Sequence, residues 1–178
     1  RVLVAMSGGV DSSVAAALLQ EGVITPHSRV FCPGSFRYGG RTYRCWKKEG
    51  HGSVDLRDAL KKSCDVYFYT MGLRLGIDRI AKYSESFGFG HRSGIPLAQE
   101  KPGLVPTSSW KLRRFGEKWM AGETVSASIG QGYNLTTPLQ LAVAFAALSN
   151  GGHVLAPRLV LAHSEDGRMV EEPLPEPV

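Results

Sequence analysis

The sequence has no long apolar run and only three cysteines among its 178 residues. A helix that crosses a bilayer needs about 20 consecutive apolar residues. No stretch approaches this length, so we expect no membrane anchor in this sequence. We also expect no secretory signal, because the apolar stretch at residues 2–6 is short and runs into glycines.

The few cysteines point away from a disulfide framework, since their number is odd. Cys32, Cys45 and Cys64 show no CxxC pairing and no spacing typical of metal ligands. We therefore predict no metal site, and we expect no cofactor. The cysteines do not fix the redox compartment.

The composition is that of a globular chain, with 43% hydrophobic and 21% charged residues. This length favours one domain with a sizeable core. The last stretch, residues 171–178, reads EEPLPEPV, and its prolines and glutamates predict a flexible acidic tail.

Positive charge is in excess, with a formal net charge of +5. Part of the excess lies in residues 37–48, RYGGRTYRCWKK, where aromatic residues alternate with cations. A nucleic-acid patch would have this composition. We favour the alternative, a solvated basic loop, and expect no nucleic-acid partner.

Apolar periodicity predicts a chain with helices early and strands late, the pattern of an α+β fold. Helices are expected from Asp11 or Ser12 to Gly22 and over 54–62, 63–76, 78–87 and 138–149. Strands are expected at residues 2–6, 124–129 and 154–163, with a turn at 165–167 and a return strand at 168–170. Residues 25–52 and 88–122 read as loops.

The first motif, SGGVDSS, follows a predicted strand and opens a predicted helix. Glycines and a helix N-terminus in this layout can bind phosphate. Residues 1–22 resemble the PP-loop of ATP pyrophosphatases, most closely the tRNA 2-thiouridylase group. The resemblance implies nucleotide binding by Ser7, Gly8, Gly9, Asp11 and Ser12.

The rest of the chain does not support an ATP site. No further βα units follow Gly22 to hold adenine and ribose, and the catalytic cysteines of that family have no counterparts here. The alternative is a strand and a helix that only pack against the protein.

A second and longer resemblance covers about residues 18–160, within a domain fragment that we expect to span residues 18–170. It rests on strings such as YRCWKKEGHGSVDLRDALKKSCDVYFY at 43–69 and GETVSASIGQGYNLTTPLQLAVAFAALSNGG at 122–152. These strings resemble the transpeptidase domain of class B penicillin-binding proteins, of the elongation type called penicillin-binding protein 2. The two resemblances meet at residues 15–22, so the chain looks like a fusion whose origin is open.

The transpeptidase resemblance implies an α+β, penicillin-binding protein/β-lactamase-like fold, with helices packed on an antiparallel sheet and incomplete at both ends. It implies D,D-transpeptidase chemistry on peptidoglycan stem peptides, acylation by β-lactams, and partner proteins of cell elongation. It also implies the periplasmic face of the inner membrane.

That chemistry needs three motifs in chain order: SxxK, SxN and KTG. Only the second is present, as Ser63-Cys64-Asp65. The resemblance implies that Ser63 is a relay hydroxyl and Asp65 its polar partner. It also implies substrate binding by Gly130, Gln131 and Gly132, on the opposite wall of the cleft. The alternative for Ser63 is a helix N-cap.

The nucleophile motif is missing, because no lysine precedes Lys47 and neither Ser7 nor Ser12 can begin SxxK. One literal SxxK occurs at residues 108–111, after the second motif, and we interpret it as a coincidence in a loop. KTG does not occur. We therefore predict an inactive transpeptidase fragment; the alternatives are an ATP-binding fragment and a non-catalytic binding module.

Overall fold

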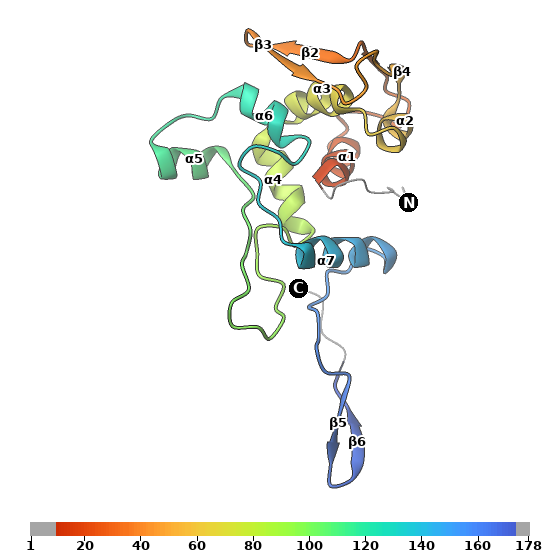
Figure 1. Cartoon of the computed structure of the whole chain (residues 1–178), viewed down its shortest axis with the longest axis vertical. Helices are drawn as coiled ribbons and strands as arrows, with labels where there is room; N and C mark the ends of the chain where they lie inside the picture. The colour runs from red at the N-terminus through yellow and green to blue at the C-terminus, as the bar shows by residue number, and fades with distance from the viewer. Residues whose placement is uncertain (1–9, 174–178) are drawn as a thin grey trace.

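The computed structural model of the chain describes residues 10–173 (Figure 1). The helices are α1 (Val10–Gln20), α2 (Leu56–Lys61), α3 (Asp65–Leu75), α4 (Ile77–Ser86), α5 (Ser108–Phe115), α6 (Ala121–Ala127) and α7 (Pro138–Ser149). The strands are β1 (Val30–Cys32), β2 (Ser35–Tyr38), β3 (Arg41–Arg44), β4 (Gly52–Val54), β5 (Ala162–Glu165) and β6 (Arg168–Glu171). The predicted α+β class is confirmed.

The five predicted helices are confirmed as α1, α2, α3, α4 and α7. Their ends follow ordinary capping chemistry. Asp55 caps α2, where its side chain accepts a hydrogen bond from the backbone of Asp58. Thr137 and Gln140 form a reciprocal capping box at the start of α7. The predicted strand at residues 2–6 lies outside the described residues.

Two helices were missed. Residues 124–129 were expected to form a strand, but most of them belong to α6, whose side chains pack on α3. A short run of alternating small residues is compatible with the periodicity of a strand and with that of a helix. Tertiary packing therefore determines which of the two forms. The predicted loop 88–122 contains α5, capped by Thr107 and closed by the left-handed Gly116.

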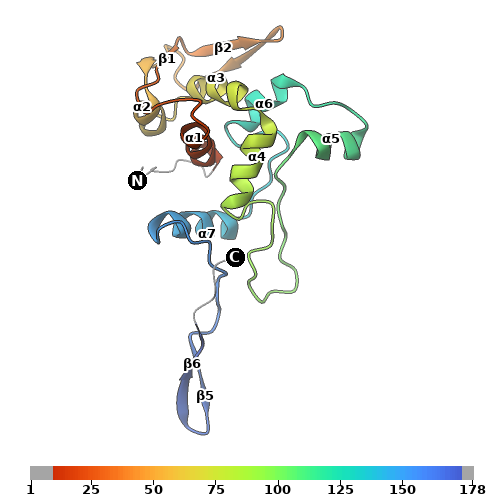
Figure 2. The same cartoon turned by 180° about the vertical axis from the view of Figure 1, so that it is seen from behind.

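The strands form three separate antiparallel pairs, β1–β4, β2–β3 and β5–β6. Within the described residues they make no single sheet on which the helices pack. The turn at 165–167 and the return strand are confirmed, and β5–β6 extends away from the helices (Figure 2).

The strand expected at 154–163 forms only from Ala162 onward. Pro157 lies within the predicted run and cannot donate to a strand ladder. At the predicted flexible tail, Glu171 belongs to β6, and residues 174–178 lie outside the described part of the chain.

The core surrounds α3. Tyr67, Phe68 and Met71 are buried on this helix, and Val14 and Leu18 of α1 are buried with them. Helix α1 contacts both α3 and α4, so it is a part of the core and not an N-terminal appendage. No helix in the described region is long and apolar enough to cross a bilayer.

Helix α7 does not bury its largest side chain, since Phe145 is 42% exposed. The buried residues follow the helical spacing i, i+3, i+4, i+7 from Gln140. The amide of Gln140 accounts for this choice, because its Nε2 donates to the carbonyls of His91 and Pro102, each at 2.7 Å.

Close packing of α3 on α6 depends on Gly72. A Cβ at this position would lie 2.3 Å from the Cβ of Ser128, which is fully buried. We expect Gly72→Ala to lower the free energy of unfolding by about 1–3 kcal/mol, because the two segments must separate. Urea unfolding measures this, with Ser86→Ala on the exposed side of α4 as the control. Equal stability of the two variants would contradict the tight packing.

Candidate functional site

A polar pocket of about 440 Å³ lies between β3 and the segment that follows α6. This size is within the usual range for ligand pockets. The pocket brings together Asp65 of the second motif and Gln131 of the predicted opposite wall. The other lining residues are 41–46, Tyr69, Ser126 and Ile129.

Asp65 is the first residue of α3, and its carboxylate holds the residues that follow β3 against that helix. Its Oδ2 accepts a hydrogen bond of 3.0 Å from the backbone N–H of Trp46. The Trp46 indole donates to the carbonyl of Lys62, also at 3.0 Å. A carboxylate in the first turn of a helix is favoured by the helix dipole. Asp65 is therefore fixed at the edge of the pocket.

Ser63 does not cap α3; the N-cap is Cys64, which makes no side-chain capping bond. The alternative interpretation of Ser63 was therefore wrong. Ser63 has a left-handed backbone with φ of 48°, which is uncommon for a residue with a Cβ. Such conformations concentrate at functional sites. Its role as a relay hydroxyl stays a prediction.

The segment 130–132 is a tight turn after α6, and its two glycines have φ of 74° and 75°. The side-chain amide of Asn134 donates to the carbonyls of Ala127 and Gln131 and so holds this turn. Gln131 lines the pocket, whereas Gly130 and Gly132 are not among its lining residues. Substrate binding by these three residues stays a prediction.

The literal SxxK string at residues 108–111 is helical, so its placement in a loop was wrong. The serine and the lysine of this string are hydrogen bonded to two different carboxylates. Ser108 Oγ donates to Asp78 at 2.7 Å, and Lys111 Nζ donates to Glu123 at 2.6 Å. The hydrogen bond that Lys111 donates to Glu123 raises the pKa of Lys111. A lysine held charged is a poor base, which supports the interpretation of this string as a coincidence.

Of the residues predicted to bind a nucleotide, Ser7, Gly8 and Gly9 lie outside the described residues. Asp11 and Ser12 are in α1. Most of the predicted nucleotide-binding loop therefore lies outside the described residues, while α1 packs against α3 and α4.

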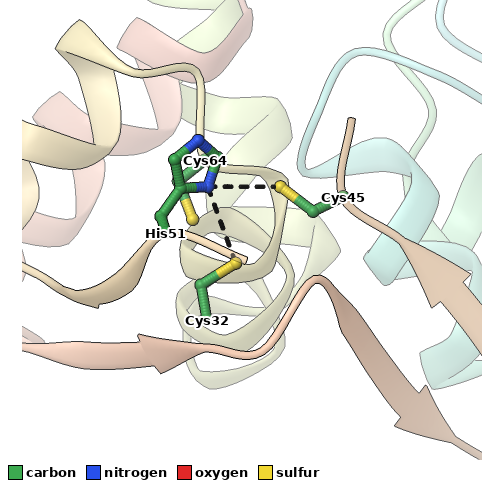
Figure 3. Close-up of side chains that lie close together, drawn as sticks. All are labelled: Cys32, Cys45, His51 and Cys64. Atoms are coloured by element: carbon green, nitrogen blue, oxygen red, sulfur yellow. Dashed lines mark hydrogen bonds between the residues drawn. The ribbon is translucent and has the colours of Figure 1, made fainter. Parts of the chain in front are cut away.

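A second cluster lies beside the pocket and was not expected. Cys32, Cys45, His51 and Cys64 each direct one ligand atom to a common centre, and all four atoms lie within 4.8 Å of one another (Figure 3). Nδ1 of His51 is 3.6 Å from Sγ of Cys32 and 3.5 Å from Sγ of Cys45. All three cysteines are buried and none is in a disulfide.

Four separate segments supply this cluster. Cys32 ends β1, Cys45 follows β3, His51 precedes β4, and Cys64 is the N-cap of α3. Two glycines allow the loops to approach. A Cβ on Gly34 would lie 2.0 Å from the carbonyl oxygen of Lys48, and one on Gly50 would lie 2.2 Å from that of Cys32.

The donor set fits a metal ion. A tetrahedral site with bonds of about 2.0–2.3 Å separates its ligand atoms by about 3.3–3.8 Å, and the two N–S distances from His51 fall in this interval. Three cysteines and one histidine are a typical set for structural zinc.

Burial favours the neutral forms of the thiols and the imidazole in this cluster. It raises the pKa of Cys45, and it raises the pKa of Cys64 to about 12. Burial, followed by the positive charges of Lys47 and Lys62, lowers the pKa of His51. These directions apply to the metal-free cluster, in which no bound cation stabilises thiolates.

The prediction of no metal site overlooked this cluster because it relied on short ligand spacings. The ligands here come from different segments, and only the fold makes them neighbours. One signal was present: three cysteines and a histidine lie in a region rich in glycine, and glycines permit the close loop crossings that ligand clusters need.

Comparison with known proteins identifies the fold. The family described as "Penicillin binding protein transpeptidase domain" matches residues 12–176. The Escherichia coli K12 peptidoglycan D,D-transpeptidase MrdA is 41% identical over 163 residues, which are 90% of this chain and 26% of MrdA. The chain therefore spans about a quarter of this curated relative.

Solved structures agree with this assignment. Pseudomonas aeruginosa PBP2, in complex with WCK 5153, has a TM-score of 0.84 and 40% identity over 96% of this chain and 39% of its own. Helicobacter pylori PBP2, in complex with MreC, has a TM-score of 0.83 and 33% identity over 96% of this chain and 31% of its own.

The family match begins at Ser12, so it includes most of α1, the helix that we also compared with a PP-loop protein. The matches support the transpeptidase resemblance over about nine tenths of the chain, and they support neither a PP-loop segment nor a fusion. The chain belongs to the family of penicillin-binding protein transpeptidase domains.

Proposed function

We propose that this chain is the second-motif segment of a peptidoglycan D,D-transpeptidase of the elongation type. The observation that carries the proposal is the pocket shared by Asp65 and Gln131, which lie far apart in the sequence. Asp65 is held by the backbone of Trp46, so its carboxylate has a fixed place at this pocket. The substrate is the D-Ala-D-Ala end of a stem peptide.

We propose that the chain alone does not perform acyl transfer. It has no lysine before Lys47 and no KTG string. The serine of its one SxxK string is hydrogen bonded to Asp78, and the lysine is paired with Glu123. Loss of the nucleophile unit removes most of the rate enhancement of such enzymes.

Fluorescent penicillin tests this second proposal. We expect no stoichiometric band after incubation, denaturation and electrophoresis, whereas full-length Escherichia coli MrdA serves as a labelled positive control. The variant Ser108→Ala tests whether Ser108 is the residue that penicillin acylates. A covalent band on the unaltered chain that disappears in Ser108→Ala would show that the 108–111 string is a nucleophile motif after all.

Partners and location follow from the same proposal. The Helicobacter pylori relative is described in complex with MreC, and we propose that a protein containing this segment works with partners of cell elongation at the periplasmic face of the inner membrane. A non-catalytic binding module remains the alternative. It would bind a stem peptide without requiring the D-Ala-D-Ala terminus, so a peptide ending in L-Ala-L-Ala distinguishes the two.

A second candidate function, metal binding, is favoured by the cluster of Cys32, Cys45, His51 and Cys64. We propose that it holds one Zn²⁺ in a closed structural site. Cys64 is the middle residue of the second motif, and Cys45 also lines the pocket. A metal there would tie β1, β3 and the start of α3 together beside Ser63 and Asp65; the protein ligands would position these elements and take no part in acyl transfer.

A further inference from the structure

The hairpin of β2 and β3 carries an uncompensated positive charge. Five cations, but no aspartate or glutamate, lie between residues 30 and 48. Arg37, Arg41 and Arg44 are all exposed. Within the part of the chain that the structure describes, the side chains of these three arginines make no ion pair and no hydrogen bond, whereas Arg29 and Arg79 each have a carboxylate partner.

Two of these arginines border the pocket that contains Asp65 and Gln131. Arg41 and Arg44 are among its lining residues, at the wall formed by β3. Figure 1 shows this hairpin above α3 and beside α6. The other lining residues of the pocket lie on these two helices and in the segments that follow β3 and α6. The cations are thus placed next to the candidate site.

The orientation of β3 is fixed by its packing. Tyr43 donates a hydrogen bond to the carbonyl of Gly122 and its ring lies 5.7 Å from that of Tyr69. Arg41, two residues away on the same face of the strand, lies over the Tyr43 ring with its guanidinium 5.3 Å from the ring centre. The hydroxyl of Tyr69 binds the carbonyl of Arg44. The packing of Tyr43 and the backbone of Arg44 therefore hold β3 in place, and both Arg41 and Arg44 line the pocket.

Such an arrangement suits a ligand with both amide and carboxylate groups. Guanidinium groups bind carboxylates through paired, charge-assisted hydrogen bonds. The pocket lining also offers a carboxylate and an amide, from Asp65 and Gln131, which can pair with peptide N–H and C=O groups. The combination is that of a peptide site with an anion-binding rim.

We propose that Arg41 and Arg44 bind the free α-carboxylate of the γ-linked D-glutamate of the stem peptide while the peptide backbone lies along the pocket beside Asp65. The inference rests on the proposed function, since it takes the stem peptide as the ligand. It adds a charge requirement: the segment discriminates in favour of stem peptides that retain a carboxylate over those in which it is amidated.

A pair of peptides differing in one group tests this inference. We choose L-Ala-γ-D-Glu-L-Lys-D-Ala-D-Ala and its D-isoglutamine counterpart, in which the α-carboxylate of the second residue is an amide. Binding to the unaltered chain is measured by calorimetry or NMR titration. We expect the carboxylate peptide to bind about tenfold more tightly, in keeping with a charge-assisted hydrogen bond.

Substitutions of the two arginines test whether they cause the preference for the carboxylate peptide. In Arg41→Gln and Arg44→Gln we expect the preference for the carboxylate peptide to fall to about onefold to threefold, with little change for the amidated peptide. Arg57→Gln, an exposed arginine on α2, is the matched control and should keep the full preference. Circular dichroism checks that each variant is folded, and the two-peptide comparison on the unaltered chain needs no variant.

The other outcomes separate a failure of this inference from a failure of the proposed function. Equal binding of the two peptides overturns this inference and leaves the proposed function standing. Binding of neither peptide overturns the proposed function and this inference with it. Displacement of the peptide by a single-stranded oligonucleotide at stoichiometric concentration would identify the hairpin as a nucleic-acid surface and would overturn the carboxylate assignment.

Discussion

Purified under non-chelating conditions, the chain is expected to contain about one equivalent of zinc, and removal of that zinc is expected to lower its melting temperature by about 8–16 °C. A ligand present at about 1,000 times its Kd stabilises the folded state by about 4 kcal/mol. For a domain of this size, each kcal/mol corresponds to about 2–4 °C. Zinc analysis by mass spectrometry and a thermal melt with and without chelator measure the two effects.

The physical reason is that three buried thiols and a partly buried imidazole surround one centre. Without a metal, the packing of four loops depends on weak contacts among these groups. With a metal, four strong bonds connect segments that are distant in the sequence. Because a preformed site does not exist in the unfolded chain, the binding free energy adds directly to folding stability.

Single substitutions separate metal binding from general destabilisation. Cys64→Ser and His51→Ala are expected to lose the zinc, whereas His153→Ala, at an exposed histidine outside the cluster, should retain it. Substitution of Co²⁺ for Zn²⁺ should give the strong visible absorption of thiolate-bound cobalt in a tetrahedral site. Full zinc content in Cys64→Ser, or a chain that melts identically with and without chelator, would contradict the assignment.

Truncation of the core is expected to have a comparable effect. Phe68→Ala should lower the free energy of unfolding by about 3–5 kcal/mol, because the side chain is almost fully buried on α3 and its removal leaves a cavity. The ring also makes an edge contact with Tyr67, with ring centres 5.6 Å apart. Chemical denaturation with a two-state fit measures the change.

Phe145→Ala is the matched control, because it removes the same atoms from a half-exposed position on α7. We expect a loss of less than about 1 kcal/mol there, since exposed substitutions usually change stability little. Similar losses for the two variants would mean that the Phe145 face of α7 is buried in solution, for example against a second copy of the chain.

The sequence determined five of the described helices, α1, α2, α3, α4 and α7, because their signals are local. Apolar spacing, Asp55 and Thr137 at N-caps, and Gly22 and Gly76 at helix ends act within a few residues of where they lie. The hairpin turn at Asp166-Gly167 was recognisable for the same reason. The strings around Ser63-Cys64-Asp65 were long enough to carry the family resemblance.

Tertiary structure decided what depends on distant partners. Residues 124–127 are helical in contact with α3, where Gly72 leaves room for the adjoining Ser128, and no local signal shows that contact. The buried face of α7 follows from the carbonyls that receive the amide of Gln140. The cysteine–histidine cluster exists only because close loop crossings at Gly34 and Gly50 place its ligands together. Local order is encoded within a few residues, whereas a site of converging side chains is a property of the packed chain.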